Sequence, residues 1–391
     1  MLKTQYDVVI IGAGPSGLAS AIAIASKSQL SVLVLDQRDK DHQRVGENIP
    51  PETLILLQKL GLESQFYQDG HEVCPGFASV WGSDSVGYND FIVNPYGQSW
   101  RLNRHAFDMS LLNRACELGV EVVWQRRFVS AKKVMLDNQC GYQIHLQAQP
   151  LSQAEPQSDT ANICLVKANF VIDASGSGAS FAKSQKVKKQ VDDKLIAIVR
   201  FAKLKHAYKG KQVRIEANSN SWCYHALLPE QKVVSMLIAE RGDRQALESD
   251  AYHGFKVQLA NTLWVSDQLN KLALLDEEYH TYLVTSGILE QVGGEHWIAV
   301  GDAAASFDPI SAQGIYKGLQ HGLLAAKVVL ETLEEVSAKQ GQQMIDYADI
   351  VQRGYREYIQ NRQRVYQKEK RWPSNDFWLN RNPVSSQHER G

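Results

Sequence analysis

Cysteine is scarce in this chain, and its spacing excludes two common kinds of site. The 391 residues include five cysteines, no two of which form a Cys-x-x-Cys pair or lie near a histidine at ligand spacing. This pattern argues against a disulfide framework and against a zinc site. We therefore expect no bound metal and a reducing, cytoplasmic location. The five are Cys74, Cys116, Cys140, Cys164 and Cys223.

Long apolar runs and an excess of one charge are also absent. No segment approaches the roughly 18 consecutive apolar residues of a membrane-spanning helix, and the N-terminus enters a strand without a signal-peptide cleavage pattern. The 42 lysines and arginines nearly balance the 43 aspartates and glutamates, which leaves a net charge of −1. We therefore expect no membrane span, and bulk charge gives no case for a nucleic-acid partner.

The strongest local motif is a glycine fingerprint near the N-terminus. A β-branched strand precedes it, an Ala/Ile-rich helix follows, and a second apolar strand ends in Asp36. Gly12 permits a tight turn, Gly14 lets the backbone approach a pyrophosphate, and Gly17 lets the helix pack on the strand. This context indicates a bound dinucleotide. Its ribose hydroxyls would donate hydrogen bonds to the Asp36 carboxylate. The fingerprint serves NAD and FAD equally. It reads Gly12-Ala13-Gly14-Pro15-Ser16-Gly17.

A second ligand-binding element is expected between Trp297 and Gly322. A short apolar strand ends there in Gly301-Asp302, and a helix begins behind a proline and a serine. A carboxylate at the end of a strand can accept hydrogen bonds from a polyol. The helix start at Gln313–Ile315 offers free N–H groups and a partial positive charge. This element can hold a sugar and an anion, although the pattern also fits an ordinary connection with a capping aspartate.

Two further motifs complete a recognisable order. An arginine, Arg104, precedes a helix, and the strand that ends at Asp173 leads into Asp173-Ala-Ser-Gly176. With the fingerprint and the Gly-Asp turn, these pieces resemble the flavoprotein monooxygenase superfamily, which includes the aromatic hydroxylases and the flavin-dependent tryptophan halogenases. The resemblance spans most of residues 5–330 and implies that the cofactor is FAD.

The resemblance also implies a role for each motif. The fingerprint and Asp36 would hold the ADP half of FAD, Arg104 would lie along the cofactor, and Asp302 would bind the ribityl chain. The helix that begins at Gln313 would face the N1/O2 edge of the flavin, where a helix start stabilises negative charge. The implied cofactor-binding set is Gly12, Ala13, Gly14, Pro15, Ser16, Gly17, Asp36, Arg104, Gly176, Gly301, Asp302, Gln313, Gly314 and Ile315.

The implied fold is α/β, with a Rossmann-like FAD-binding domain, an antiparallel substrate sheet and a helical C-terminal region. Apolar runs at 195–201, 222–228 and 233–239 are expected to be strands of that sheet. The polar segment 149–162 is expected to be a surface loop or hairpin tip. The predicted boundaries are 1–60, 100–185 and 290–330 for the FAD-binding domain, 61–99 and 186–289 for the substrate domain, and 331–391 for the tail.

A narrower resemblance rests on shorter motifs. They are Gly46-Glu-Asn-Ile-Pro-Pro51, Ser79-Val-Trp-Gly-Ser83, Phe307-Asp-Pro-Ile-Ser-Ala-Gln-Gly314 and the tail aromatics Trp372, Phe377 and Trp378. Together they resemble the LodB/GoxB-like flavoproteins that accompany quinone-cofactor amine and amino-acid oxidases. The resemblance implies a monooxygenase that oxygenates a tryptophan of a partner oxidase precursor on the way to cysteine tryptophylquinone. The precursor and molecular oxygen would then be its partners.

Two features of related enzymes are missing. Halogenases of this superfamily use a lysine and a Trp-x-Trp-x-Ile-Pro signature. No two of the eight tryptophans lie two residues apart, and the segment 75–81 has no lysine, so halogenation is disfavoured. A second glycine fingerprint is also lacking. The electron donor is therefore either NAD(P)H that visits the flavin transiently or a separate reductase.

No convincing catalytic acid or base emerges from the sequence. Glu47 either lies near the flavin ring or caps a helix, and Asp308 either serves the flavin site or fixes a turn. His225, on a strand of the substrate sheet, is either an acid/base group or a buried structural histidine. Two other functions remain open on the same FAD site. One is a hydroxylase of a small aromatic metabolite or an isoprenoid reductase, and the other is a non-enzymatic flavin-bearing chaperone of the precursor.

Overall fold

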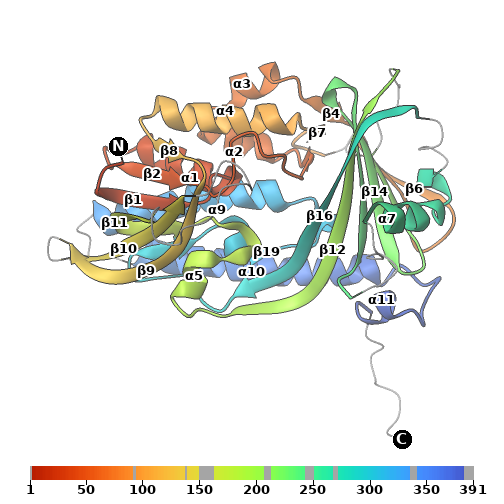
Figure 1. The fold of residues 1–391 in the computed structure, drawn as a ribbon. Helices are drawn as coiled ribbons and strands as arrows, with labels where there is room; N and C mark the ends of the chain where they lie inside the picture. Colours follow the sequence, from red (N-terminus) through yellow and green to blue (C-terminus); the bar gives the residue numbers. More distant parts are fainter. Residues whose placement is uncertain are drawn as a thin grey trace, which may run out of the picture.

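The computed structural model describes residues 2–90, 94–136, 139–148, 163–206, 213–242, 251–266, 272–334 and 341–382. Within these ranges the chain forms two large sheets and several helices, and the predicted α/β class is confirmed. Figure 1 shows the long strands β12 (Lys189–Leu204) and β16 (Leu274–Leu289) reaching from the second sheet toward the first. The predicted polar loop at 149–162 lies outside the described residues.

The first sheet has a parallel core that the glycine fingerprint follows. Its parallel strands lie in the order β18-β11-β1-β2-β8. Strand β1 reads QYDVVII and its last four residues are all buried, as expected for a parallel strand covered on both faces. The core strands are β1 (Gln5–Ile11), β2 (Val32–Leu35), β8 (Glu121–Val123), β11 (Ile163–Asp173) and β18 (Trp297–Ala299).

Antiparallel strands extend this sheet. Strands β9 (Arg126–Leu136) and β10 (Gln139–Ala148) pair with each other, β10 pairs with β11, and β17 (Gly293–Gly294) pairs with β18. The β9–β10 ribbon was not predicted as a pair of strands. Strand β9 contains mainly half-buried and exposed residues, whereas β10 alternates between buried and half-buried positions from Tyr142 to Gln147.

Two helices pack closely behind the fingerprint. Helix α1 (Pro15–Ala25) follows β1, and α9 (Gly314–Leu333) packs against it. A methyl group on Gly322 would lie 2.7 Å from the carbonyl oxygen of Ser16. Only glycine permits the two backbones to approach so closely. Helix α4 (Arg104–Glu117) also contacts α1, and the short helix α5 (Ser180–Ser184) packs near β9.

The second sheet contains the three strands predicted from the runs at 195–201, 222–228 and 233–239. They correspond to β12, β14 (Ser221–Leu228) and β15 (Lys232–Glu240), which pair antiparallel, with a tight turn at Pro229–Gln231. Helix α7 (Ala251–Ala260) contacts β15 and β16. The remaining strands are β5 (Gly76–Val80), β6 (Val86–Asp90), β13 (Val213–Ala217) and β19 (Ala305–Ser306), in the order β19-β16-β12-β15-β14-β13-β5-β6.

A small third sheet is formed by strands that lie, in the chain, between strands of the two large sheets. Strands β3 (Asn48–Ile49) and β4 (Glu72–Cys74) both pair antiparallel with β7 (Ser99–Arg101). Helices α2 (Thr53–Lys59) and α3 (Glu63–Gln68) lie between β3 and β4 in the chain. The segment 61–99 therefore contributes strands to two different sheets. The pairing of β3 with β7 fixes the position of Glu47, which immediately precedes β3.

The C-terminal region packs against the second sheet. Helix α10 (Gln342–Tyr366) runs beneath both parts of the molecule in Figure 1, and the short helix α11 (Asp376–Leu379) follows it. Trp378 is 1 % exposed and its indole N–H donates to the carbonyl oxygen of Asn218 at 3.0 Å. No helix in the described ranges is long and apolar enough to cross a membrane.

Candidate active site

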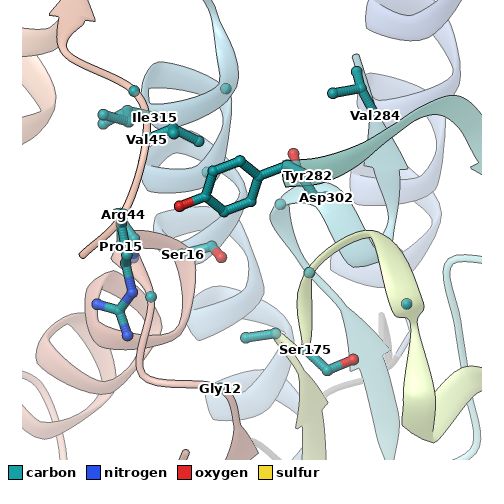
Figure 2. Close-up of a pocket in the computed structure, with 18 of the residues that line it drawn as sticks. Gly12, Pro15, Ser16, Arg44, Val45, Ser175, Tyr282, Val284, Asp302 and Ile315 are labelled. Carbon is teal, nitrogen blue, oxygen red and sulfur yellow. The ribbon is translucent and has the colours of Figure 1, made fainter. Parts of the chain in front are cut away.

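A cavity of about 710 Å³ lies between the carboxyl ends of the parallel strands and one face of the second sheet. This volume is within the usual range of roughly 300–1,000 Å³ for small-molecule sites. Figure 2 shows Tyr282 projecting from β16 between Asp302 and the segment that carries Arg44 and Val45. The cavity therefore has a glycine-rich side formed by the first sheet and a side-chain wall formed by the second.

The glycine fingerprint shapes one end of the cavity. Gly12 has φ +115°, and a methyl group on it would lie 2.2 Å from the carbonyl oxygen of Ala174. A methyl group on Gly17 would lie 2.0 Å from the carbonyl oxygen of Gly12. Gly14 differs, because a Cβ there would have no heavy atom within 4 Å, and its backbone lines the cavity. This open approach beside the uncapped start of α1 fits the pyrophosphate of a dinucleotide.

A chain of alternating charges follows the side of the cavity from Asp36. The Asp36 carboxylate accepts a hydrogen bond from the Ala13 N–H at 3.0 Å and pairs with Arg44 at 3.3 Å. Arg44 also pairs with Asp108 at 3.3 Å, and Asp108 accepts from Arg104 at 3.1 Å. Sequence reasoning missed Arg44, because it lies in a polar stretch without a motif. Asp36, Arg44 and Arg104 line the cavity, whereas Ala13 and Gly17 support it from behind.

Arg104 holds the segment that carries Glu47. Its guanidinium donates to the carbonyl oxygens of Val45 and Gly46, the latter at 3.2 Å. Gly46 has φ +105°, and a Cβ on it would lie 2.8 Å from the Arg104 guanidinium and 3.4 Å from Ile315. The glycine therefore permits a contact that a side chain would prevent.

The Gly-Asp turn and the start of α9 form the opposite end of the cavity. Gly301 has φ +57°, and Asp302 lines the cavity while its carbonyl oxygen accepts from Lys189 Nζ at 2.9 Å. The N-cap residue Gln313 makes no side-chain capping bond, and the first turn carries no acidic residue. The free N–H groups and positive dipole end of α9 therefore face the cavity beside Gly314 and suit an anionic group. Pro15, Ser16, Gly176 and Ile315 complete the predicted residues that line it.

The second sheet supplies a wall of mainly apolar side chains. Each contributing strand presents alternate residues to the cavity, as the two-residue period of a strand requires. Three of these four strands were predicted from the sequence, but the face of each strand that lines the cavity was not. Among the described residues that line it, there is no lysine. The wall consists of Ala197 and Val199 from β12, Trp222 and Tyr224 from β14, Met236 from β15, and Tyr282 and Val284 from β16.

Glu47 lines the cavity, and one oxygen of its carboxylate has no hydrogen-bond partner. Its side chain is 3 % exposed, and Oε1 has no hydrogen-bond partner. Burial raises the pKa of Glu47 to about 7, although the positive charge of Arg104 opposes this shift. Its neighbour Asn48 donates a side-chain hydrogen bond to the hydroxyl of Tyr224. Oε1 is available to a ligand because no protein donor reaches it.

Replacing Glu47 by glutamine is expected to stabilise the FAD-free protein at pH 8 but not at pH 5. A carboxyl whose pKa rises from 4.5 to about 7 on folding destabilises the fold progressively as the pH rises through that interval. At about 1.4 kcal/mol per pKa unit, the penalty that the variant escapes is about 3 kcal/mol. Urea unfolding of both proteins at the two pH values measures this effect. A difference that does not change with pH would contradict the assignment.

Asp308 fixes a turn, which is one of the two alternatives from the sequence, and it also lines the cavity. It lines the cavity and is fully buried, and its Oδ1 accepts from the Ile310 N–H at 2.9 Å, which fixes the turn. Its Oδ2 accepts from the Tyr366 hydroxyl at 2.8 Å, and that hydroxyl accepts from the indole N–H of Trp222 at 3.0 Å. Burial raises the pKa of Asp308. Helix α10 is thereby connected to the cavity wall.

Replacing Tyr366 by phenylalanine is expected to destabilise the fold by about 1–3 kcal/mol, because it leaves the buried Trp222 N–H and one oxygen of Asp308 without this partner. Tyr355→Phe is the control, since its hydroxyl donates to the exposed Asp192 at 2.6 Å. The control substitution should lower the free energy of unfolding by less than Tyr366→Phe does. Chemical unfolding curves compare the two variants. Equal losses of unfolding free energy would show that the hydrogen bonds of Tyr366 to Asp308 and Trp222 stabilise the fold no more than the exposed bond of Tyr355.

His225 lies away from the cavity. It is 3 % exposed, does not line the cavity, and its Nδ1 lies 3.0 Å from the Ser235 hydroxyl oxygen. Burial, together with the positive charges of Arg200 and Arg214, lowers its pKa to about 3. Because Tyr224 lines the cavity, the next residue on the strand points to the opposite face. Of the two alternatives predicted for His225, this geometry fits a buried structural histidine rather than an acid/base group at the cavity.

Comparisons with known proteins agree with this architecture. Residues 5–344 match the family described as FAD binding domain. The putative FAD-dependent oxidoreductase LodB of Marinomonas mediterranea is 25% identical over 98% of both chains. The flavin-dependent halogenase armH4 of Armillaria mellea is 21% identical over 87% of this chain and 68% of its own.

Two solved structures share the fold. The flavin-dependent halogenase CmlS superposes with a TM-score of 0.82 at 22% identity, over 99% of this chain and 69% of that chain. The peptidyl tryptophan dihydroxylase QhpG, described as essential for tryptophylquinone cofactor biogenesis, superposes with a TM-score of 0.72 at 20% identity, over 96% and 78% of the two chains. Among the described residues, no group of His, Cys, Asp and Glu side chains is arranged to hold a metal ion.

Proposed function

Because the chain belongs to the FAD-binding domain family and uses FAD as its cofactor, we propose that it is a monooxygenase that hydroxylates a tryptophan of a partner amino-acid oxidase precursor. The modified tryptophan would become part of a tryptophylquinone cofactor. The observation that carries the proposal is the cavity, where a dinucleotide cradle, formed by Gly14, Asp36, Asp302 and the starts of α1 and α9, shares one space with a wall suited to an aromatic ring. The similarity to LodB over nearly the whole of both chains supports a flavin-dependent oxidoreductase, and the fold shared with QhpG, a peptidyl tryptophan dihydroxylase, supports the choice of substrate.

The residues of the cradle have separate roles in this proposal. Gly14 and the start of α1 would bind the pyrophosphate, Asp36 would accept hydrogen bonds from the ribose hydroxyls, and Asp302 would accept hydrogen bonds from the ribityl hydroxyls. The start of α9 at Gln313 stabilises negative charge on the ring system. When bound, FAD supplies the redox chemistry that activates molecular oxygen.

The wall of the second sheet would position the substrate ring and exclude water. Trp222, Tyr224 and Tyr282 offer aromatic surfaces against which an indole can pack. A dry site favours transfer of oxygen to the ring over unproductive loss of the oxidant to water. The electron donor is NAD(P)H or a separate reductase.

Halogenation is the principal competing reaction, because halogenases are among the relatives. The absence of a lysine among the described lining residues supports oxygenation, since halogenases of this superfamily use a lysine to hold the oxidised halogen. Mass analysis separates the two reactions directly.

The test is co-expression of a quinone-type oxidase precursor with this protein, followed by intact-mass and peptide analysis of the precursor. We expect an added oxygen on one tryptophan, and none with the variant Gly14→Val, which is designed to lose FAD. An added halogen would identify a halogenase. An unmodified precursor with flavin still bound would favour the small-aromatic hydroxylase. A stable complex with no oxygen consumption would favour the chaperone.

A further inference from the structure

The cavity contains a buried acceptor that the proposed oxygenation does not by itself explain. Glu47 follows the tight backbone at Gly46, and its carbonyl oxygen accepts from the Leu102 N–H at 2.7 Å, so its main chain is fixed. Its carboxylate is almost completely shielded, yet Oε1 has no donor. Burying a charged acceptor without a hydrogen-bond donor is unfavourable compared with leaving it in water, so such groups usually have a ligand or a function.

The carboxylate lines the cavity close to the wall of the second sheet. Burial raises the pKa of the wall residues Tyr224 and Tyr282, and the negative charge of Glu47 raises both further. Its neighbour Asn48 uses its side-chain N–H₂ group on the Tyr224 hydroxyl, which fixes that ring beside it. The remaining wall residues carry no charge. Both oxygens of Asp308, which also lines the cavity, already accept hydrogen bonds from the protein, so a ligand packed on the wall meets a free acceptor at Glu47 Oε1.

We propose that the Glu47 carboxylate accepts the ring N–H of the substrate's indole and thereby selects tryptophan over aromatic side chains that lack this donor. Indole is a flat apolar ring with a single N–H, so the wall would bind its faces and the carboxylate its edge. Hydrogen bonds to charged groups are among the stronger ones in proteins. The proposal rests on the proposed function, because it assumes that a tryptophan enters this cavity.

The same contact would assist attack on the ring. Positive charge develops on the indole nitrogen when an electrophilic oxygen adds to a ring carbon, and a carboxylate already in place stabilises that charge. Deprotonated Glu47 is the better acceptor, so selectivity for the N–H should increase as the pH rises through 7. The other titratable groups that face Glu47 are Arg104 from α4, Tyr224 from β14 and Tyr282 from β16.

The experiment compares two peptides from the precursor that differ in one atom of the target side chain. One contains tryptophan and the other benzothienylalanine, in which sulfur replaces the N–H. Binding to the oxidised, FAD-loaded protein is measured by calorimetry and by the change in flavin absorption, so no turnover is needed. We expect the wild-type protein to prefer the tryptophan peptide roughly ten- to a hundredfold at pH 8.

Three variants make the result specific to Glu47. Glu47→Leu should bind both peptides equally, and Glu47→Gln, which keeps an oxygen acceptor without the charge, should retain a preference of only a few-fold. Glu331→Gln is the matched control, since Glu331 is also buried but lies on α9 outside the cavity. It should behave as the wild type. Retained FAD and an unchanged melting temperature show that each variant is folded.

Equal binding of the two peptides by the wild type would overturn the inference, as would a preference that survives in Glu47→Leu or the failure of both peptides to bind. These failures are distinguishable from failure of the proposed function. Oxygenation of the precursor without any N–H preference would reject the role of Glu47 alone. A clear N–H preference without an added oxygen on the precursor would reject the oxygenation alone.

Discussion

Replacing Gly14 by valine is expected to abolish FAD binding while leaving the protein folded. The φ of −81° at Gly14 is accessible to any residue, and a Cβ there would meet no heavy atom within 4 Å. The isopropyl group would therefore grow into the cavity, where the backbone must approach the pyrophosphate. We expect affinity for FAD to fall by at least about 100-fold, or about 2.7 kcal/mol. Titration of the FAD-free protein with FAD, followed by flavin fluorescence, measures this loss.

Two other glycines provide controls for this substitution. Gly242 also has open space around its Cβ position but does not line the cavity, so Gly242→Val should bind FAD normally. Gly12→Ala should instead destabilise the fold, because φ is +115° and the new methyl would lie 2.2 Å from a backbone oxygen. Normal FAD binding by Gly14→Val would place the cofactor elsewhere and reject the assigned cradle.

Replacing Trp378 by alanine is expected to cost about 3–5 kcal/mol of stability, the usual range for truncating a buried tryptophan or phenylalanine. Trp378 is 1 % exposed and its ring packs edge-on against Trp81 at a centroid distance of 5.4 Å. It also contacts Tyr366, whose hydroxyl bonds to Asp308 beside the cavity. The substitution would therefore leave a hole beneath the cavity wall. Urea unfolding of the FAD-free protein measures the loss.

Trp372 is the comparison residue for this effect. Its ring stacks on Trp378 at a centroid distance of 6.1 Å, but it is only partly buried. Trp372→Ala should therefore cost clearly less than Trp378→Ala, because a partly exposed site loses less apolar burial. Similar losses for the two variants would show that the tail docks less specifically than the packing indicates. A negligible loss of unfolding free energy in Trp378→Ala would show that the tail does not stabilise the cavity wall.

The elements of the cradle were predictable because their signals are local. Gly12, Gly14 and Asp302 each belong to a strand followed by a turn and a helix, and such a unit is specified by a few adjacent residues. The family resemblance implied that these elements, far apart in the chain, share one site, and the meeting of the carboxyl ends of neighbouring parallel strands at one edge of a sheet gives the physical reason. The structure places these residues around one cavity.

The wall of the cavity was not predictable to the same degree. Which face of β14 lines the cavity depends on its register with β15, and a shift of one residue would exchange Tyr224 for His225. Register is set by long-range pairing rather than by adjacent residues. The ion pair of Arg44 with Asp36 and the contact of Tyr366 with Asp308 likewise join distant segments, and no motif marks them.

The most direct test of the proposed reaction uses purified protein, FAD, a chemical reductant and the unmodified precursor under heavy-isotope dioxygen. Peptide mass analysis then reports the source of any oxygen on tryptophan. We predict that heavy oxygen from the gas appears on one tryptophan of the precursor, and that Gly14→Val produces none. Oxygen derived from water, halogen in its place when halide is present, or an unmodified precursor in the presence of bound FAD would contradict oxygenation by this protein.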